Sequence, residues 1–88
     1  MQVTFDPAKN DSNEHKHGVP LSLAAEFEWE DALCWEDTRY RYGEPRMVAL
    51  GYIGLRLYSV VFVDRGGRRR IISLRKANSR EVKRYAET

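Results

Sequence analysis

Residues 55–76 read LRLYSVVFVDRGGRRRIISLRK and predict the two strands around which the fold is built. The first strand runs from Leu55 to Asp64 and the second from Arg68 to Lys76, with Arg65-Gly66-Gly67 as a tight turn between them. The run Val60-Val61-Phe62-Val63 is apolar on both faces, which is typical of a central strand. An antiparallel hairpin is therefore expected in the middle of the sheet.

Alternation and capping signals on either side of this hairpin predict the remaining elements. They are a strand at Gln2 to Phe5, a helix from Ala8 to His17 that Asp6-Pro7 opens and Gly18 closes, a second helix at Pro20 to Trp29, a short edge strand at Ala32 to Trp35, a loop from Asp37 to Pro45, a strand from Arg46 to Tyr52, and a final helix that begins with Asn78 and Glu81. The order β-α-α-β-β-β-β-α predicts an α+β fold. We expect a compact antiparallel sheet with N-terminal helices and a C-terminal helix.

The first predicted helix is unusual because Ala8 is the only apolar residue in the segment from Ala8 to His17. A helix that is polar on all sides is not held in place by burial of an apolar face. Either its polar groups make specific contacts, or the helix is a mobile surface element.

Length and composition predict one domain, residues 1–88, near the lower size at which a core forms without staples. Hydrophobic residues make up 42% and charged residues 32%, which is typical of a globular chain. Cys34 is the only cysteine, so there is no disulfide framework and no cysteine metal site. No run approaches the roughly 18 apolar residues of a membrane span, and no signal-peptide pattern opens the chain. We expect a cytoplasmic protein.

Charge is distributed unevenly along the chain. Residues 1–37 hold two Lys and nine Asp or Glu, a net charge of −7, whereas residues 38–88 hold thirteen Lys or Arg and four Asp or Glu, a net charge of +9. A basic second part favours phosphate groups as the partner. The alternative is that the two parts neutralise each other within the fold.

The arginine-rich strand from Arg68 to Lys76 offers cations on a rigid element. A period of two predicts that Arg69, Ile71, Ser73 and Arg75 share one face, and that Arg70, Ile72, Leu74 and Lys76 share the other. The planar donor fork of arginine suits phosphate oxygens. The alternative is a charged strand that discourages edge-to-edge pairing.

Lys16 and His17 lie at the end of the first predicted helix. Two titratable groups at that point can give and take protons near neutral pH. The alternative is that they only cap the helix, because basic residues interact favourably with a helix C-terminus.

The loop after Asp37 mixes arginines and tyrosines, namely Arg39, Tyr40, Arg41 and Tyr42. This mixture suits stacking on single-stranded bases, although a solvated loop is an equal alternative. Glu44 could act as a general base, but the spacing places no second carboxylate beside it. The chain has no phosphate-binding glycine loop, no metal-ligand spacing and no nucleophile signature.

Several short motifs, taken in order, resemble the BrnT family of bacterial toxins from type II toxin-antitoxin systems. The motifs are Phe5-Asp6-Pro7-Ala8-Lys9, Asn13, Lys16-His17-Gly18, Gly43-Glu44-Pro45-Arg46, Ala49-Leu50-Gly51, Arg70 to Ala77, Glu81 and Tyr85. They cover nearly the whole chain, and their order and spacing are more specific than any single motif. Leu74-Arg75-Lys76 departs from a commoner Ala-Arg-Arg pattern, and the loop from Arg39 to Tyr42 has no clear family counterpart.

The resemblance implies a compact ribonuclease fold similar to RelE, RNA cleavage without a metal or other cofactor, and arrest of translation. It also implies a cognate ribbon-helix-helix antitoxin that masks the toxin, forms a hetero-oligomer with two toxins, and makes the contacts to operator DNA. The residues implied as catalytic are Lys16, His17, Glu44, Arg46 and Arg75, and those implied to bind RNA are Arg70, Ser73, Lys76 and Tyr85.

The chemistry expected for such a protein is attack by an RNA 2′-hydroxyl on its own phosphate. It needs a base, cations for the developing phosphorane charge, and an acid for the leaving oxygen. Glu44 or His17 is a candidate base, and Arg75, Arg46 and Lys16 are candidate phosphate ligands. Two other classes stay open: a non-catalytic nucleic-acid-binding module, and an interaction protein whose basic face serves only an acidic partner.

Overall fold

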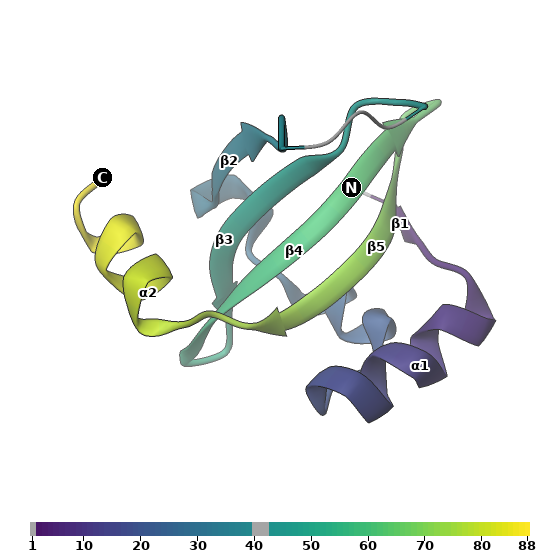
Figure 1. Cartoon of the computed structure of the whole chain (residues 1–88), viewed down its shortest axis with the longest axis horizontal. Helices are drawn as coiled ribbons and strands as arrows, with labels where there is room; N and C mark the ends of the chain where they lie inside the picture. Colours follow the sequence, from purple (N-terminus) through teal and green to yellow (C-terminus); the bar gives the residue numbers. More distant parts are fainter. Residues whose placement is uncertain (1, 40–42) are drawn as a thin grey trace.

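The computed structural model describes residues 2–39 and 43–88, which form a five-stranded mixed sheet in the order β1-β5-β4-β3-β2 (Figure 1). The strands are β1 (Gln2–Thr4), β2 (Leu33–Glu36), β3 (Met47–Ile53), β4 (Arg56–Arg65) and β5 (Arg68–Lys76). The α-helices are α1 (Pro7–His17) and α2 (Ser79–Ala86), and the 3₁₀ helices are η1 (Leu21–Glu26) and η2 (Trp29–Asp31). None of the helices in these residues is long and apolar enough to cross a membrane.

The predicted hairpin is confirmed at the centre of the sheet. β4 lies third of the five strands and pairs antiparallel with both β3 and β5. Gly66 and Gly67 form the turn with φ of 54° and 80°, a left-handed region that side-chain-bearing residues avoid. The α+β class predicted from the element order is therefore confirmed.

The expectation of a purely antiparallel sheet is wrong at one edge. β1 pairs parallel with β5, and Gln2 to Thr4 lie beside Arg68 to Arg70. Alternation of apolar residues identifies a strand but carries no information about its direction, which depends on the path that the chain takes through α1 and η1.

The expectation of one α-helix from Pro20 to Trp29 is also wrong, because this segment forms η1 and η2 instead. Leu21 and Ala24 are fully buried, and Phe27 is nearly so. Residues three apart eclipse one another on a 3₁₀ helix, so this spacing directs Leu21 and Ala24 toward the sheet, and Phe27 follows as the extended C-cap of η1. A Cβ on Gly51 would lie 2.5 Å from the Phe27 ring, so β3 requires glycine there.

The main core lies on the sheet face that η1 and η2 cover. Its fully buried members from the strands include Ala49, Val60, Phe62, Ile71 and Leu74. A smaller cluster lies on the opposite face, where α2 packs against one end of the sheet. Its buried members are Leu50, Leu57 and Ala77, with Leu33, Trp35, Tyr52 and Tyr85 packed against them.

The polar helix α1 is attached to the sheet by a buried amide. The Asn13 side chain donates to the carbonyl oxygens of Leu74 (2.7 Å) and Val19 (2.8 Å), and its Oδ1 accepts from the Leu74 N–H at 3.2 Å. Asn13 thus bonds both backbone groups that Leu74 turns away from β4, as a neighbouring strand would. Of the two possibilities left open by the sequence, specific polar contacts are confirmed.

A β-bulge interrupts β5 and changes which arginines share a face. Val61 pairs with Ser73 but Phe62 pairs with Ile71, so Ile72 is an extra residue in β5. The predicted faces are therefore wrong for the residues that precede Ile72 relative to those that follow it. Arg69 and Ile71 lie on the face covered by the helices.

Arg70, Ser73 and Arg75 lie together on the opposite face of the sheet. Their partners in β4 are Val63, Val61 and Ser59, which alternate along that strand and so share a face. The bulge thus brings Arg70 into line with Ser73 and Arg75, a grouping that the period of two does not predict.

Candidate functional site

The free edge of β5 and one side of α1 line a hollow of about 220 Å³. We call it the α1 hollow, and it is lined by Lys9, Ser12, Asn13, Lys16, His17, Ile72 and Ser73. Three of the predicted site residues, Lys16, His17 and Ser73, therefore come together in the structure. The edge is open for this contact because β1 pairs only with the first three residues of β5 (Figure 1).

Lys9 and Ser12 also line this hollow, and they were not predicted as site residues. Lys9, Ser12 and Lys16 are spaced by three and then four residues, so they lie along one face of α1. Asn13 fixes that side of the helix against β5. The helical spacing of polar residues is the signal that could have identified both.

The titration of His17 in the α1 hollow is altered. Partial burial lowers the pKa of its imidazole below 6.5, and the positive charges of Lys16 and Arg75 lower it further. The ring is consequently mostly neutral at pH 7 and can accept a proton. Arg75 lies on the opposite face of β5, yet its charge lowers the pKa of His17 in the α1 hollow.

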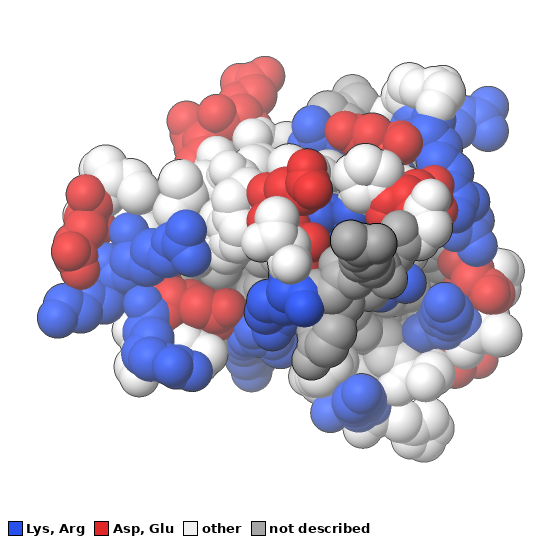
Figure 2. Space-filling view, turned by 45° about the horizontal axis from the view of Figure 1, so that its top comes forward, with Lys and Arg blue, Asp and Glu red and all other residues white. Residues whose placement is uncertain are grey.

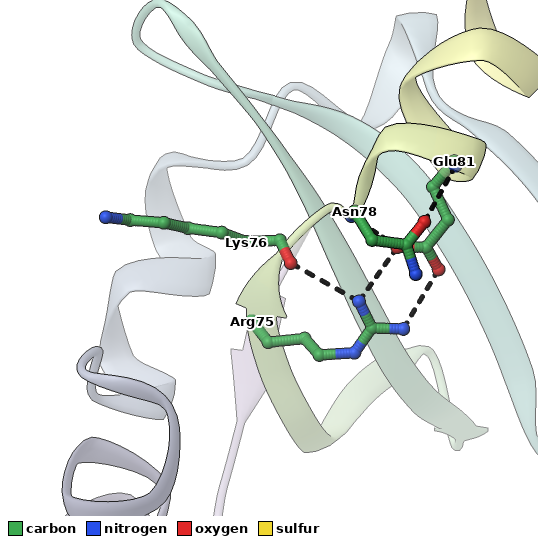
Figure 3. Close-up of polar contacts among 4 residues, drawn as sticks. All are labelled: Arg75, Lys76, Asn78 and Glu81. Atoms are coloured by element: carbon green, nitrogen blue, oxygen red, sulfur yellow. Dashed lines mark hydrogen bonds and ion pairs between the residues drawn. The ribbon is translucent and has the colours of Figure 1, made fainter.

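Arg75 is held in one orientation by the first turn of α2 (Figure 3). Its Nη1 and Nη2 donate to the two oxygens of the Glu81 carboxylate at 2.8 and 2.9 Å, and Nη1 also donates to the Lys76 carbonyl at 3.3 Å. These contacts occupy three of the five N–H groups of the guanidinium. The hydrogen bond with Glu81 raises the pKa of Arg75 and keeps it charged.

Glu81 also caps the N-terminus of α2. Its side chain accepts from the Asn78 N–H while the Asn78 side chain accepts from the Glu81 N–H, which is the predicted capping box. Partial burial acts to raise the pKa of Glu81, but the hydrogen bonds from Arg75 and Asn78 outweigh it and the pKa is lowered. Capping α2 and orienting Arg75 are thus done by one carboxylate.

Lys76 points away from Arg75, on the other side of β5 (Figure 3). It pairs with Tyr58, whose side chain belongs to the core on the face covered by the helices. Lys76 and Arg75 are therefore not a single cationic pair, although they are neighbours in the sequence.

Glu44, Arg46 and Arg70 form a separate group at the β4–β5 turn. The Glu44 carboxylate pairs with Arg65 through two hydrogen bonds, Nε to Oε2 at 2.9 Å and Nη2 to Oε1. The hydrogen bond from Arg65 is the largest cause that lowers the pKa of Glu44, and the charges of Arg46 and Arg70 lower it further. This group lies toward the turn end of β5, where Arg70 precedes the Ile72 and Ser73 of the α1 hollow by two and three residues.

Tyr85 belongs to α2, and its side chain packs against the smaller cluster on the sheet. Its hydroxyl donates to the Asp31 carbonyl at 2.9 Å, and its ring meets the Tyr52 ring edge-on with centroids 5.6 Å apart. These contacts fasten α2 to the sheet. Its predicted role in RNA binding stays a prediction.

The loop proposed to stack on bases is described only in part, because Tyr40, Arg41 and Tyr42 lie outside the described residues. Arg39 is described and pairs with Asp37 through Nε–Oδ1 at 3.0 Å and Nη2–Oδ2 at 3.1 Å. Asp37 is buried, so this pair fixes the position of Arg39 beside the sheet face.

On the face shown in Figure 2, the positive charges do not form one continuous patch. Figure 2 shows Lys and Arg side chains gathered on the left, the side on which α2 lies in Figure 1, and on the right, with Asp and Glu between them. On this face the Lys and Arg side chains are therefore divided between two regions. In the described part of the chain, His, Cys, Asp and Glu form no group of three or more that could hold a metal ion.

Fold and site together define a small α+β protein in which a histidine, lysines and an arginine converge around the edge of one strand. A model of one protein family, described as the ribonuclease toxin, BrnT, of type II toxin-antitoxin systems, matches residues 5–81. The chain belongs to this family of ribonuclease toxins. A search of curated proteins gives no match. Membership makes RNA the substrate class and an antitoxin the partner.

Proposed function

We propose that this chain is an endoribonuclease that cleaves RNA by attack of a 2′-hydroxyl on the adjacent phosphate, without a metal ion. The observation that supports this most strongly is the convergence of Lys16, His17 and Ser73 in the α1 hollow, with Arg75 close enough to act on the His17 pKa. These residues supply a proton acceptor, fixed cations and a hydroxyl at one place in a chain that belongs to a ribonuclease family.

His17 is the better candidate for the base. Its lowered pKa leaves a neutral imidazole at pH 7, which can take the proton from the 2′-hydroxyl. The new bond forms between the 2′-oxygen and phosphorus, and the bond from phosphorus to the 5′-oxygen breaks. The 5′-oxygen then takes a proton from an ammonium group of the α1 hollow, Lys9 or Lys16.

Glu44 is the weaker candidate. Both of its oxygens accept hydrogen bonds from Arg65, and the pKa of its carboxyl is lowered, so it has little affinity for a proton at neutral pH. We assign Arg46 and Arg70 to contacts with the RNA backbone beside the reacting phosphate, and we assign Glu44 to holding Arg65 in place.

Arg75 and Lys16 provide charge where the transition state becomes more negative. The guanidinium is oriented by Glu81 before any substrate arrives, so little reorganisation is needed during the reaction. The Nε–H and one Nη2–H of Arg75 are not used in its hydrogen bonds to Glu81 and Lys76 and can donate to phosphate oxygens. Fixed cations of this kind can stabilise a phosphorane in place of a metal ion.

We further propose that the fold is of the RelE type and that the antitoxin is a ribbon-helix-helix protein, which binds two toxins through its own dimer. The mixed sheet with η1 on one face, α1 at the β5 edge and α2 at the end of the other face is consistent with such a toxin. Operator DNA is then contacted only through the antitoxin, and translation is arrested when the toxin is released.

The test compares three substrates with the purified chain in EDTA: a structureless RNA, the same sequence as DNA, and the RNA with 2′-O-methyl groups. We expect cleavage of the unmodified RNA alone, because only that substrate has a free 2′-hydroxyl. Cleavage of the DNA, or an absolute need for an added divalent ion, would contradict the mechanism. Salt-sensitive RNA binding without any cleavage would favour the non-catalytic module.

A further inference from the structure

Two adjoining hollows lie on the sheet face that carries Arg75. The first, the sheet-face hollow, has a volume of about 290 Å³, with Val48 and Val61 as its floor and Trp35 at its side. The second, the arginine hollow, has a volume of about 280 Å³ and is lined by Arg39, Arg75, Asn78, Arg80, Glu81 and Arg84. Arg39, Arg75 and Glu81 line both hollows and join them.

The arginine hollow gathers four guanidinium groups around one carboxylate. Two of the arginines are matched, since Arg75 pairs with Glu81 and Arg39 pairs with Asp37. Within residues 2–39 and 43–88, no ion pair is formed by Arg80 or Arg84. Like charges gathered in this way repel one another, and a bound anion relieves the repulsion.

Arg84 is positioned to bind such an anion. Its guanidinium carbon lies 3.9 Å from the centroid of the Trp35 ring, so the face of the guanidinium is occupied. The N–H donors of a guanidinium lie in its plane, and stacking leaves them available for phosphate oxygens. Arg84 therefore links the aromatic wall of one hollow to the charge of the other.

The sheet-face hollow has the shape and chemistry for a flat, partly apolar group. Its volume of about 290 Å³ is at the lower limit of ligand pockets, about 300 Å³, which allows one ring system rather than a stack. The valine floor offers apolar contact, and the buried Ser59 in the same lining offers a hydroxyl. A nucleobase combines an apolar face with polar edges and fits these walls.

We propose that the two hollows form a nucleotide subsite for single-stranded RNA, with one base in the sheet-face hollow and its phosphate between Arg80 and Arg84 in the arginine hollow. This inference rests on the proposed function, because the strand is taken to continue from this subsite past Arg75 to His17. The subsite holds the nucleotide next to the reacting phosphate and so contributes to the choice of cleavage site.

The test is a binding measurement that needs no cleavage. A short, fluorescently labelled 2′-O-methyl RNA is titrated with the wild type, with Arg80→Ala and with Lys83→Ala. Lys83 is the matched control, because it lies on the same helix and removes the same charge but lines neither hollow. We expect Arg80→Ala to weaken binding about tenfold and to lower the slope of log affinity against log salt by about 1, with Lys83→Ala changing affinity less than twofold.

A second oligonucleotide tests the base. Each oligonucleotide of a series lacks the base at one position, and the position differs from one oligonucleotide to the next. We expect the wild type to bind one member of the series more weakly than the rest. In Val61→Phe, where the new ring fills the sheet-face hollow, we expect all members of the series to bind equally. Circular dichroism and melting temperature establish that each variant is folded. Trp35 lies at the wall of the hollow, so quenching of tryptophan fluorescence gives an independent signal.

Three results would overturn the subsite. One is equal weakening by Arg80→Ala and Lys83→Ala, which indicates unspecific attraction. Another is equal binding of all strands that lack a base. The third is binding of a glutamate-rich peptide that depends on Arg80 while RNA binding does not, which assigns the surface to a protein partner. Binding that depends on Arg80 in a protein that cleaves no RNA would retain the subsite and reject the nuclease mechanism.

Discussion

At the scale of single residues, Arg75 is the side chain on which the proposed chemistry depends most. It sits on a paired strand, and Glu81 fixes its guanidinium before substrate binds. We predict that Arg75→Ala lowers cleavage about 100-fold, which corresponds to the roughly 3 kcal/mol lost with one preorganised transition-state contact. Arg56→Ala, which removes an exposed arginine at the start of β4, is the matched control and is expected to retain activity.

The folding of Arg75→Ala and Arg56→Ala has to be compared before their cleavage rates are compared. Arg75→Ala also releases Glu81, yet the capping box with Asn78 survives, so the loss of stability should be about 1 kcal/mol or less. Full cleavage by a folded Arg75→Ala protein would remove Arg75 from the site.

The titration of His17 gives a second prediction at this scale. Its pKa is lowered by burial and then by the charges of Lys16 and Arg75, so the rate should rise with pH through a midpoint below 6.5 and then level off. Lys16→Gln removes one of these charges and should move the His17 pKa upward, toward the ordinary value. Proton NMR of the imidazole ring measures the shift directly, and a downward shift or none would show that Lys16 does not act on the ring.

At the scale of elements, the attachment of α1 depends on Asn13. Asn13→Ala leaves the Leu74 N–H and C=O without their partners beside the core, and we predict a loss of about 2–4 kcal/mol in the free energy of unfolding. Asn10→Ala is the control, because Asn10 also bonds a backbone group, the Ser22 N–H, but at an exposed position. Its cost should be about 1 kcal/mol or less.

Denaturant unfolding of both variants gives the comparison. Equal stability of Asn13→Ala and Asn10→Ala would mean that the buried amide does not hold α1, and the geometry of the α1 hollow would then need another explanation.

The elements also show how far the sequence predicts the structure. The central hairpin, the bounds of α1 and the capping box of α2 follow from local signals in apolar runs, glycines and caps. The bulge at Ile72 does not follow from a local signal, because the adjacent Ile71 and Ile72 fit either a regular or a bulged strand. As a result the sequence assigned Ser73 and Arg75 to one face correctly but placed Arg69 there in error and Arg70 on the opposite face.

The site was predicted in part for a similar reason. Lys16, His17 and Ser73 do meet, and Arg75 acts on the same histidine. Glu44 does not join them, since its partner Arg65 comes from the far end of β4 and no local pattern reveals a pair 21 residues apart. Which of these residues contribute to catalysis stays a prediction.

At the scale of the whole molecule, the divided basic surface predicts how the antitoxin acts. A partner that covers the sheet face near α2 would meet Arg75, Arg80 and Arg84, and an acidic segment would neutralise them. By mass action it would stabilise the toxin by about 4 kcal/mol at a concentration 1,000 times its dissociation constant. Mixing the chain with its antitoxin should therefore raise the melting temperature of the toxin and suppress RNA cleavage. The mass of the complex should correspond to two toxins bound to one antitoxin dimer.

The controls for this mixture are an unrelated ribbon-helix-helix protein and high salt. The unrelated protein should leave both melting temperature and cleavage unchanged. If the antitoxin binds without suppressing cleavage, it does not cover the site, and the masking role assigned to it is wrong.

The most direct test of the central proposal is the chemical identity of the cleaved ends. Attack by the 2′-hydroxyl leaves a 2′,3′-cyclic phosphate on one fragment and a 5′-hydroxyl on the other, and mass spectrometry distinguishes these from a 3′-hydroxyl and a 5′-phosphate. We predict cyclic phosphate and 5′-hydroxyl ends in EDTA, with yields that fall together in His17→Ala and Arg75→Ala but not in Arg56→Ala. Fragments that carry 5′-phosphates, or cyclic ends produced equally well by His17→Ala, would contradict a site built from α1 and β5.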